Sequence, residues 1–130
     1  MDIAYEEALH FLDSLKDYEK TTNFSYERDL HLERVRVLLE RVGNPQEAFA
    51  SIHIAGTRGK GSVAAMIYSV LKASGLRAGL YTSPHLTSRR ERIRYAENPF
   101  EERLIEEEEL AAGIHRLRPH LETLLAQRGW

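Results

Sequence analysis

Apolar residues along this 130-residue chain recur every three or four positions in several stretches, which is the spacing of one face of an α-helix. This pattern predicts helices over 5–15, 32–42, 63–74 and 106–127. Gly43 with Pro45 just beyond is expected to end the second helix, and Gly75 the third. Residues 17–25 lose all periodicity and are interpreted as a polar linker. Pro119 should kink or split the last helix.

Two short apolar stretches, 51–55 and 78–82, flank the third predicted helix and are expected to be strands. A strand, a helix and a strand of this length form a right-handed β-α-β unit with parallel strands. The predicted fold is therefore α/β, with helices leading into a parallel β-α-β unit. Ligands in such sheets gather at the carboxyl ends of the strands, so segments that follow these two strands are expected to open onto one edge.

The first predicted strand runs directly into a glycine-rich loop with the sequence A-G-T-R-G-K-G-S over 55–62. Its glycines can adopt the positive φ angles that turn successive backbone N–H groups toward one anion, and the helix that follows adds a partial positive charge. Lys60 supplies a full charge for the β- and γ-phosphates. The pattern predicts a nucleotide-phosphate site made of Gly56, Thr57, Arg58, Gly59, Lys60, Gly61 and Ser62.

The loop departs from the strict P-loop pattern G-x-x-x-x-G-K-[ST] at two positions. Ile54 stands where the first glycine belongs, and Gly61 separates Lys60 from Ser62. The alternative interpretation is a glycine-rich β-to-α turn whose lysine is merely solvated.

The variant A-G-T-x-G-K-G-S resembles the ATP-binding loop of folylpolyglutamate synthases and dihydrofolate synthases, members of the Mur ligase superfamily. Y-T-S-P-H-L, which follows the second predicted strand, is the most specific further piece of the likeness. Other similar stretches are Y-E-E-A-L at 5–9, L-E-R-V at 32–35, L-L-E at 38–40, G-N-P-Q at 43–46 and E-R-I-R at 91–94. The resemblance implies that residues 1–130 form the N-terminal part of a P-loop-type Mur ligase ATPase domain, without the rest of that domain or the C-terminal domain.

The resemblance implies ATP-dependent amide formation in folate biosynthesis and one-carbon metabolism. A carboxylate of folate or dihydropteroate would attack the γ-phosphate of ATP, and the amine of L-glutamate would then attack the acyl phosphate. ATP and Mg²⁺ are the implied cofactors, and Lys60 is the expected catalytic residue. The family's downstream magnesium ligands, modified lysine and second domain are absent from the sequence, so the chain is expected to be inactive alone.

The segment after the second predicted strand carries the candidate substrate residues. Ser83 can reach the same space as Lys60, and the resemblance also implies that it is a magnesium ligand; the alternative is a helix N-cap. His85 is either a substrate contact or a structural hydrogen-bonding residue. Arg92 and its arginine neighbours can hold carboxylates or lie on a solvated strand edge, and the resemblance favours a loop over the pterin-bearing substrate. The predicted substrate-binding set is Thr82, Ser83, Pro84, His85 and Arg92.

Two positions differ from the family pattern. Arg58 replaces an asparagine of the glycine-rich loop, where it could add charge to the phosphates or obstruct the loop. Residues 95–99 replace a short glycine-containing turn, so the edge of the substrate loop is expected to have a different shape.

Composition excludes several classes of protein. The formal net charge of −2 gives no general attraction for nucleic acid, and no stretch approaches the eighteen consecutive apolar residues of a membrane helix. The absence of cysteine excludes disulfides and thiolate nucleophiles, and the histidines lack zinc-ligand spacing. The acidic N-terminus lacks the features of a secretory signal, so the cytoplasm is the expected location. The glutamates at 101, 102 and 106–109 are interpreted as the solvated start of the last helix.

Two other functions stay open. One is a non-catalytic nucleotide-binding or assembly module that uses an exposed sheet edge, and the other is a Mur-type ligase for another carboxylate. An unpaired sheet edge and an apolar seam from Leu110 to Leu124 predict that the isolated chain self-associates.

Overall fold

The computed structural model describes residues 3–15 and 32–128, and the chain divides into two compact units. The first unit combines Met1–Ser51 with Ala111–Trp130, and the second is Ile52–Leu110. No helix in the described ranges has both the length and the apolar character that a membrane span needs.

The first unit is helical, as the apolar spacing predicts. Its elements are α1 (Ile3–Ser14), α3 (Leu32–Arg41), a 3-10 helix at Pro45–Ala48, and the part of α5 (Glu107–Arg128) that follows Leu110. Gly43, at φ +85°, lies just beyond the end of α3. Pro119 lies inside α5 without splitting it. The predicted linker at 17–25 lies outside the described residues.

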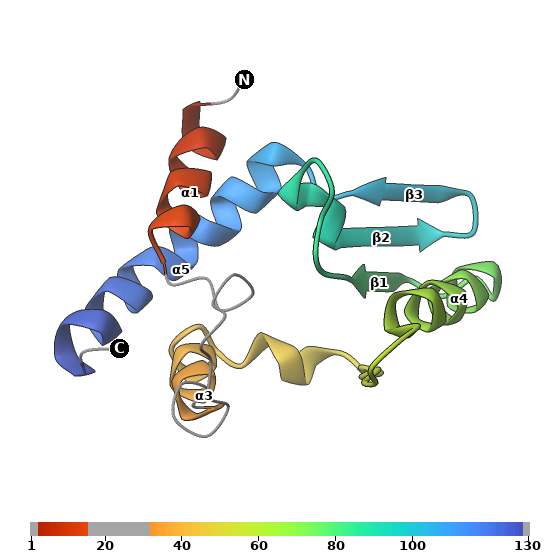
Figure 1. Ribbon diagram of the computed structural model, residues 1–130, viewed down its shortest axis with the longest axis horizontal. Helices are drawn as coiled ribbons and strands as arrows, with labels where there is room; N and C mark the ends of the chain where they lie inside the picture. Colours follow the sequence, from red (N-terminus) through yellow and green to blue (C-terminus); the bar gives the residue numbers. More distant parts are fainter. Residues whose placement is uncertain (1–2, 16–31, 129–130) are drawn as a thin grey trace. The chain divides into compact units, whose positions relative to one another are not determined.

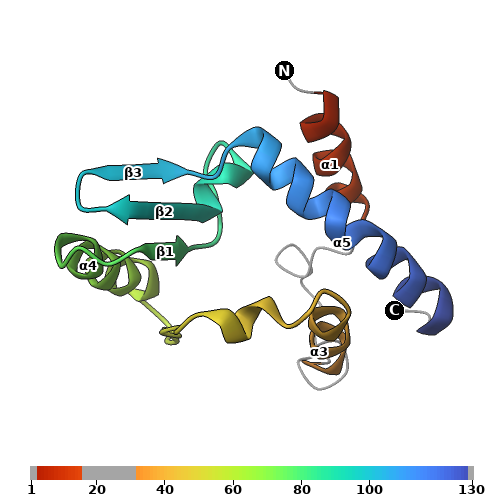
Figure 2. The same ribbon diagram turned by 180° about the vertical axis from the view of Figure 1, so that it is seen from behind.

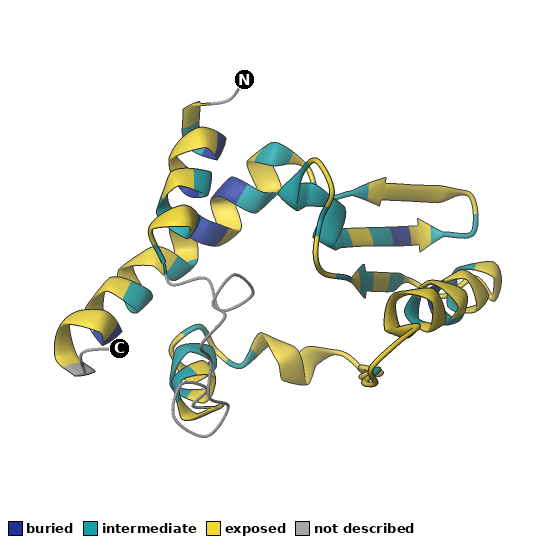
Figure 3. Ribbon diagram, in the orientation of Figure 1, coloured by how far each residue is buried: buried dark blue, intermediate teal, exposed yellow. Residues whose placement is uncertain are grey.

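The buried residues of the first unit lie on α1 and α5, and the C-terminal part of α1 lies across α5 in both views (Figures 1 and 2). Figure 3 shows buried positions on both helices, and the buried side chains are Tyr5, Ala8, Ala111, Ile114 and Leu124. The guanidinium of Arg118 also lies 5.0 Å from the ring centre of Phe11. The expectation of an uncovered seam along the last helix is wrong, because Leu110, Ile114, Leu117, Leu121 and Leu124 are all buried or half-buried.

The second unit is a small antiparallel sheet with one helix packed on it. After α4 (Lys60–Ala73) come β1 (Ala78–Tyr81), a 3-10 helix at Arg89–Arg92, β2 (Ile93–Asn98) and β3 (Glu101–Leu104). The strand order is β1-β2-β3, and both pairs are antiparallel. α4 packs against β1 and β2, and its Tyr68 is buried. Val63, Met66 and Val70 of the same helix are exposed.

The predicted parallel β-α-β unit is not formed. β1 confirms the second predicted strand, but residues 51–55 have no regular secondary structure. A strand needs a hydrogen-bonded neighbour, and residues 51–55 pair with no strand of the sheet β1-β2-β3 in the described residues.

The stretch 93–104 forms a hairpin that the sequence analysis did not predict. Residues 95–98 belong to β2 and are not an edge of the substrate loop, because Tyr95 and Ala96 pair with β1 on one side and β3 on the other. The Asn98 side chain closes the turn, accepting from the N–H groups of Phe100 at 2.9 Å and Glu101 at 3.0 Å.

The acidic stretch is also divided differently from the prediction. Glu101 and Glu102 lie in β3 and not at the start of a helix. The Glu102 carboxylate forms ion pairs with Lys72 of α4 and, at 3.2 Å, with Arg94 of β2. These residues therefore tie α4 to the sheet.

Candidate phosphate and substrate loops

The glycine loop, residues 56–62, turns the chain into the N-terminus of α4. Gly59 is the residue before the helix and adopts a left-handed φ of +74°, which a side chain would oppose. Its carbonyl accepts the first helical hydrogen bond, from the Val63 N–H at 3.0 Å. No side chain caps this helix end, so the N–H groups of the first turn point out of the helix without a capping partner. This is the local geometry of an anion-binding helix terminus.

Lys60 is the first residue of α4 and reaches back over the loop. Its Nζ donates a hydrogen bond of 2.7 Å to the carbonyl oxygen of Gly56. All seven residues of the glycine loop are exposed, Arg58 and Ser62 included. The ligand-free chain therefore holds its ammonium group beside the helix N-terminus, where an incoming phosphate can displace the carbonyl.

The 82–92 loop connects β1 to β2 and contains the five predicted substrate residues. Its two ends are joined by a hydrogen bond of 3.0 Å from the Thr82 N–H to the Arg92 carbonyl. Arg92 Nε also donates to His85 Nδ1 at 2.8 Å. The structure thus brings together Thr82, His85 and Arg92.

Ser83 and Pro84 lie at the exposed part of the 82–92 loop, joined by a cis peptide bond. The Ser83 hydroxyl forms no hydrogen bond with another residue in the described part of the chain. The alternative role of Ser83 as a helix N-cap is wrong, because the 3-10 helix starts at Arg89 and is capped by Ser88. An exposed hydroxyl is a suitable single ligand for Mg²⁺, which takes most of its octahedral oxygens from phosphate and water.

Glu91 is the residue of this loop that the sequence analysis missed. Its carboxylate accepts hydrogen bonds from the N–H groups of Leu86 at 2.9 Å, Thr87 at 2.9 Å and Ser88 at 2.6 Å. The Leu86 amide makes the largest contribution to a pKa of Glu91 below the ordinary value. The spacing S-x-x-E from Ser88 to Glu91 is the signal that could have identified it, since this is a capping box.

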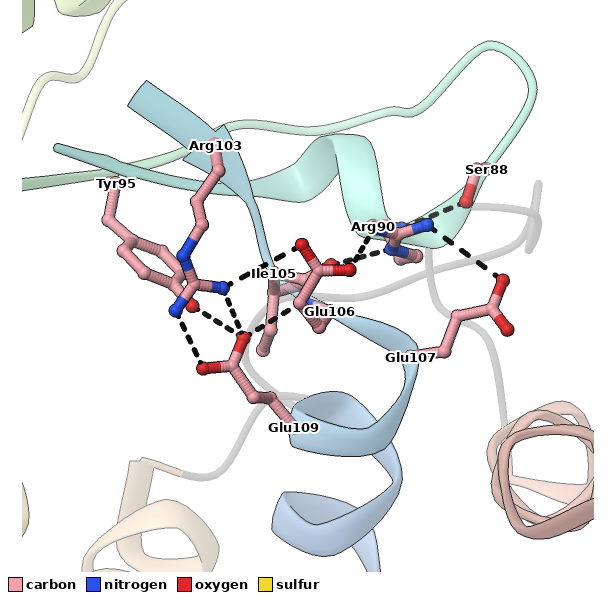
Figure 4. A network of polar contacts seen from close by, with 8 residues as sticks. All are labelled: Ser88, Arg90, Tyr95, Arg103, Ile105, Glu106, Glu107 and Glu109. Atoms are coloured by element: carbon pink, nitrogen blue, oxygen red, sulfur yellow. Dashed lines mark hydrogen bonds and ion pairs between the residues drawn. The ribbon is translucent and has the colours of Figure 1, made fainter. Parts of the chain in front are cut away.

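In the last part of the 82–92 loop, Arg90 connects the 3-10 helix to the start of α5 (Figure 4). Its Nε donates to the Ile105 carbonyl at 2.6 Å, and its guanidinium lies 3.0 Å from the Glu106 carboxylate and 3.8 Å from that of Glu107. These contacts engage the Arg90 guanidinium, so Arg90 is not available to bind a substrate in this arrangement.

A second part of the same network fixes the hairpin to α5. Arg103 of β3 holds both oxygens of Glu109, at 2.7 and 2.9 Å, and stacks 4.2 Å from the ring centre of Tyr95 (Figure 4). The Arg103 pair lowers the pKa of Glu109 to about 2, with help from the Tyr95 hydroxyl. Glu106, Glu107 and Glu109 at the helix start are thus paired with arginines, so the predicted solvated face is only partly formed.

The glycine loop precedes α4 and the 82–92 loop follows β1, an order that agrees with a shared site. The connection between helix and strand is short, residues 74–77, and the two elements run in roughly opposite directions (Figure 1). The N-terminus of α4 and the carboxyl end of β1 therefore face the same side of the second unit. In the described residues, no group of three His, Asp or Glu side chains is arranged to hold a metal ion. A shallow groove between α1 and α5, beside Phe11, contains none of the predicted site residues.

Comparisons with known proteins give a consistent result. No family model matches the chain. The dihydrofolate synthase/folylpolyglutamate synthase of Bacillus subtilis is 38% identical over 93 residues, which are 72% of this chain and 20% of that protein. The folylpolyglutamate synthase of Lacticaseibacillus casei is 42% identical over 95 residues, 73% of this chain and 21% of that protein. This chain thus spans about a fifth of the length of these two relatives.

A solved folylpolyglutamate synthase in complex with AMPPCP and folate has the same fold over the region it shares with this chain. The TM-score is 0.72 at 37% sequence identity, and the match covers 96% of this chain and 27% of that one. The mixed arrangement of helices and sheet is therefore that of a Mur-type ligase.

Proposed function

Since this chain is of the folylpolyglutamate synthase and dihydrofolate synthase type, we propose that it carries the ATP-phosphate loop and part of the substrate loop of an ATP-dependent ligase. That ligase adds L-glutamate to a carboxylate of folate or dihydropteroate. The observation that carries the proposal is the uncapped N-terminus of α4, with Lys60 folded over the glycine loop. The solved relative that contains AMPPCP and folate supports the same choice of ligands.

The residues of the glycine loop have a definite task in this reaction. The free N–H groups at the start of α4 bind phosphate oxygens, and Lys60 adds a charge-assisted bond to the β- and γ-phosphates. These donors are in place before the reaction, so they stabilise the charge that develops as the substrate carboxylate attacks the γ-phosphate. Mg²⁺, when bound, would neutralise further phosphate charge. Ser83 is the residue of this chain that would hold it, through its exposed hydroxyl.

The 82–92 loop has the complementary task of holding the acceptor substrate. Thr82, Pro84 and His85 lie on one loop, and Arg92 positions His85. We assign the pterin-bearing substrate to this loop. A ligase of the same type that acts on another carboxylate would keep the glycine loop and differ in the 82–92 loop.

We also propose that residues 51–55 form the predicted strand when they pair in parallel with the free edge of β1. Ile52 is 62% exposed, and its segment has no hydrogen-bonded partner strand among the described residues. Such pairing would give the phosphate loop the β-strand support that P-loop sites have.

Preference for the triphosphate tests the proposal directly. We expect the chain to bind Mg-ATP at least about tenfold more tightly than AMP, because the loop amides and Lys60 contact the outer phosphates and charge-assisted bonds are strong. Calorimetric titration with each nucleotide measures the ratio. Equal affinities for AMP and ATP would show that the glycine loop does not bind the outer phosphates.

Arg58 is expected to lie beside the phosphates. It is exposed within the glycine loop, and Arg58→Asn should lower ATP affinity about two- to fivefold at low salt, the range of an exposed charge pair. The difference should shrink at high salt. A dissociation constant that is the same for both chains at low salt would mean that the guanidinium is only solvated.

A further inference from the structure

The 82–92 loop keeps a defined shape with little apolar packing. Ser83, Pro84 and Thr87 are exposed, and Leu86 is 95% exposed. A loop of this kind would ordinarily sample many conformations, because no buried side chain compensates for the loss of backbone entropy. Its shape must therefore come from polar interactions.

Those polar interactions converge on two neighbouring residues. Arg92 joins the ends of the loop through its carbonyl and holds His85 through its side chain. Glu91 ties down three consecutive residues, since one carboxylate oxygen accepts from Leu86 and the other from both Thr87 and Ser88. No other side chain in the described part of the second unit accepts from three consecutive amides.

We propose that Glu91 is a positioning residue, which holds the 82–92 loop in the shape in which it receives the pterin-bearing substrate. The role in substrate binding rests on the proposed function, whereas the fixing of the loop does not. A loop that is already ordered loses less conformational entropy when a ligand binds, so Glu91 raises affinity without touching the ligand.

The position requires a carboxylate. All three groups that face Glu91 are donors, and an ionised carboxylate is an acceptor at both oxygens. A glutamine of the same size would place its NH₂ group against at least one of these N–H donors. Glu91→Gln therefore removes one or two of the three bonds and leaves the volume of the side chain unchanged.

The first test is amide hydrogen exchange on the full chain. In Glu91→Gln, the amides of Leu86, Thr87 and Ser88 should exchange at least about tenfold faster, since charge-assisted bonds are lost. The matched control is Glu97→Gln, because Glu97 lies in β2 and pairs with Arg77. Unchanged exchange at all three amides in Glu91→Gln would overturn the proposal.

The second test is a pH titration of the amide proton signals, which a purely structural change would not reproduce. The folded pKa of Glu91 is lowered, so its bonds are complete above the unfolded pKa and are lost as the pH falls through the folded one. The signals of Leu86, Thr87 and Ser88 should shift together at one midpoint below the usual range of glutamate. His85 is the titratable side chain that faces Glu91 in this loop. Three unrelated midpoints, or the same curve in Glu91→Gln, would contradict the assignment.

The third test connects the loop to its ligand. Dihydropteroate should bind Glu91→Gln at least about fivefold more weakly than it binds the wild-type chain and Glu97→Gln, in line with the lost ordering of the loop. Equal affinity would overturn the positioning role, and so would a wild-type chain that binds no dihydropteroate. ATP affinity, measured in the same samples, reports separately on the glycine loop. A chain that does not bind ATP would count against the proposed function and not against Glu91.

Discussion

Lys60→Ala should weaken the binding of Mg-ATP by about ten- to hundredfold, the range expected when a charge-assisted bond to phosphate is removed. Lys60 is the one ammonium group at the N-terminus of α4 in the described structure, and it already lies 2.7 Å from the Gly56 carbonyl. Alanine favours the helix, so the loss should come from the missing charge and not from unfolding. Isothermal calorimetry measures the affinity, and circular dichroism checks the helix content.

Lys72→Ala is the matched control for this experiment. Lys72 lies in the last turn of the same helix and pairs with Glu102, far along the helix from the glycine loop. The control removes the same charge from α4, so a general electrostatic effect would weaken ATP binding in both variants alike. If Lys60→Ala and the wild type bind ATP equally well, the glycine loop is only a turn between elements.

Self-association of the isolated chain is the second large effect that we expect. Val63, Met66 and Val70 lie on one face of α4 and are 45%, 67% and 65% exposed. Their spacing at i, i+3 and i+7 makes a continuous apolar stripe, and such stripes on a small protein are sites of association. Light scattering should therefore give a mass above that of one chain at micromolar concentration.

A pair of charges on this stripe should restore the monomer. In Met66→Glu with Val70→Glu, desolvation of two carboxylates opposes any contact through the stripe. Ala65→Glu is the control, since Ala65 directly precedes Met66 and its side chain points about 100° away from that of Met66 around the helix. A wild-type chain that stays monomeric would argue against this surface, and oligomers that persist in the double variant would place the contact elsewhere.

The helices could be predicted from the sequence because their signal is local. α1, α3, α4 and α5 all lie within a few residues of the predicted ranges, and α4 starts earlier than Val63 because the helix begins directly after Gly59. The second predicted strand is confirmed as β1. Helix periodicity depends only on residues that are close in sequence, so the prediction does not need the rest of the fold.

The sheet was harder to predict because strands depend on partners. The stretch 51–55 has the composition of a buried strand but no partner here, whereas residues 93–98 form a strand because β1 and β3 lie on either side of them. β-propensity largely describes how a side chain fits its cross-strand neighbours. The direction of pairing could not be read from residues that the sequence analysis had assigned to a loop.

The candidate site was predictable to a similar extent. The residues of the glycine loop are consecutive in sequence, so they lie close together in any fold. The bonds of Glu91 and the pairing of Arg92 with His85 depend on a chain reversal after Pro84, which the sequence pattern did not specify. The functions of both sets of residues stay predictions.

The two outer strands of the sheet differ in how readily they accept a further strand. β3, with the sequence E-E-R-L, has three charged side chains in four residues, and charges on an edge strand oppose the addition of a further strand. β1, with the sequence A-G-L-Y, has no ionised side chain along its length. Growth of the sheet is thus blocked on one side and permitted on the other. A fibril-forming or strand-swapped product of this chain would have to start at β1, and a single lysine at Gly79 or Leu80 would be the natural place to stop it.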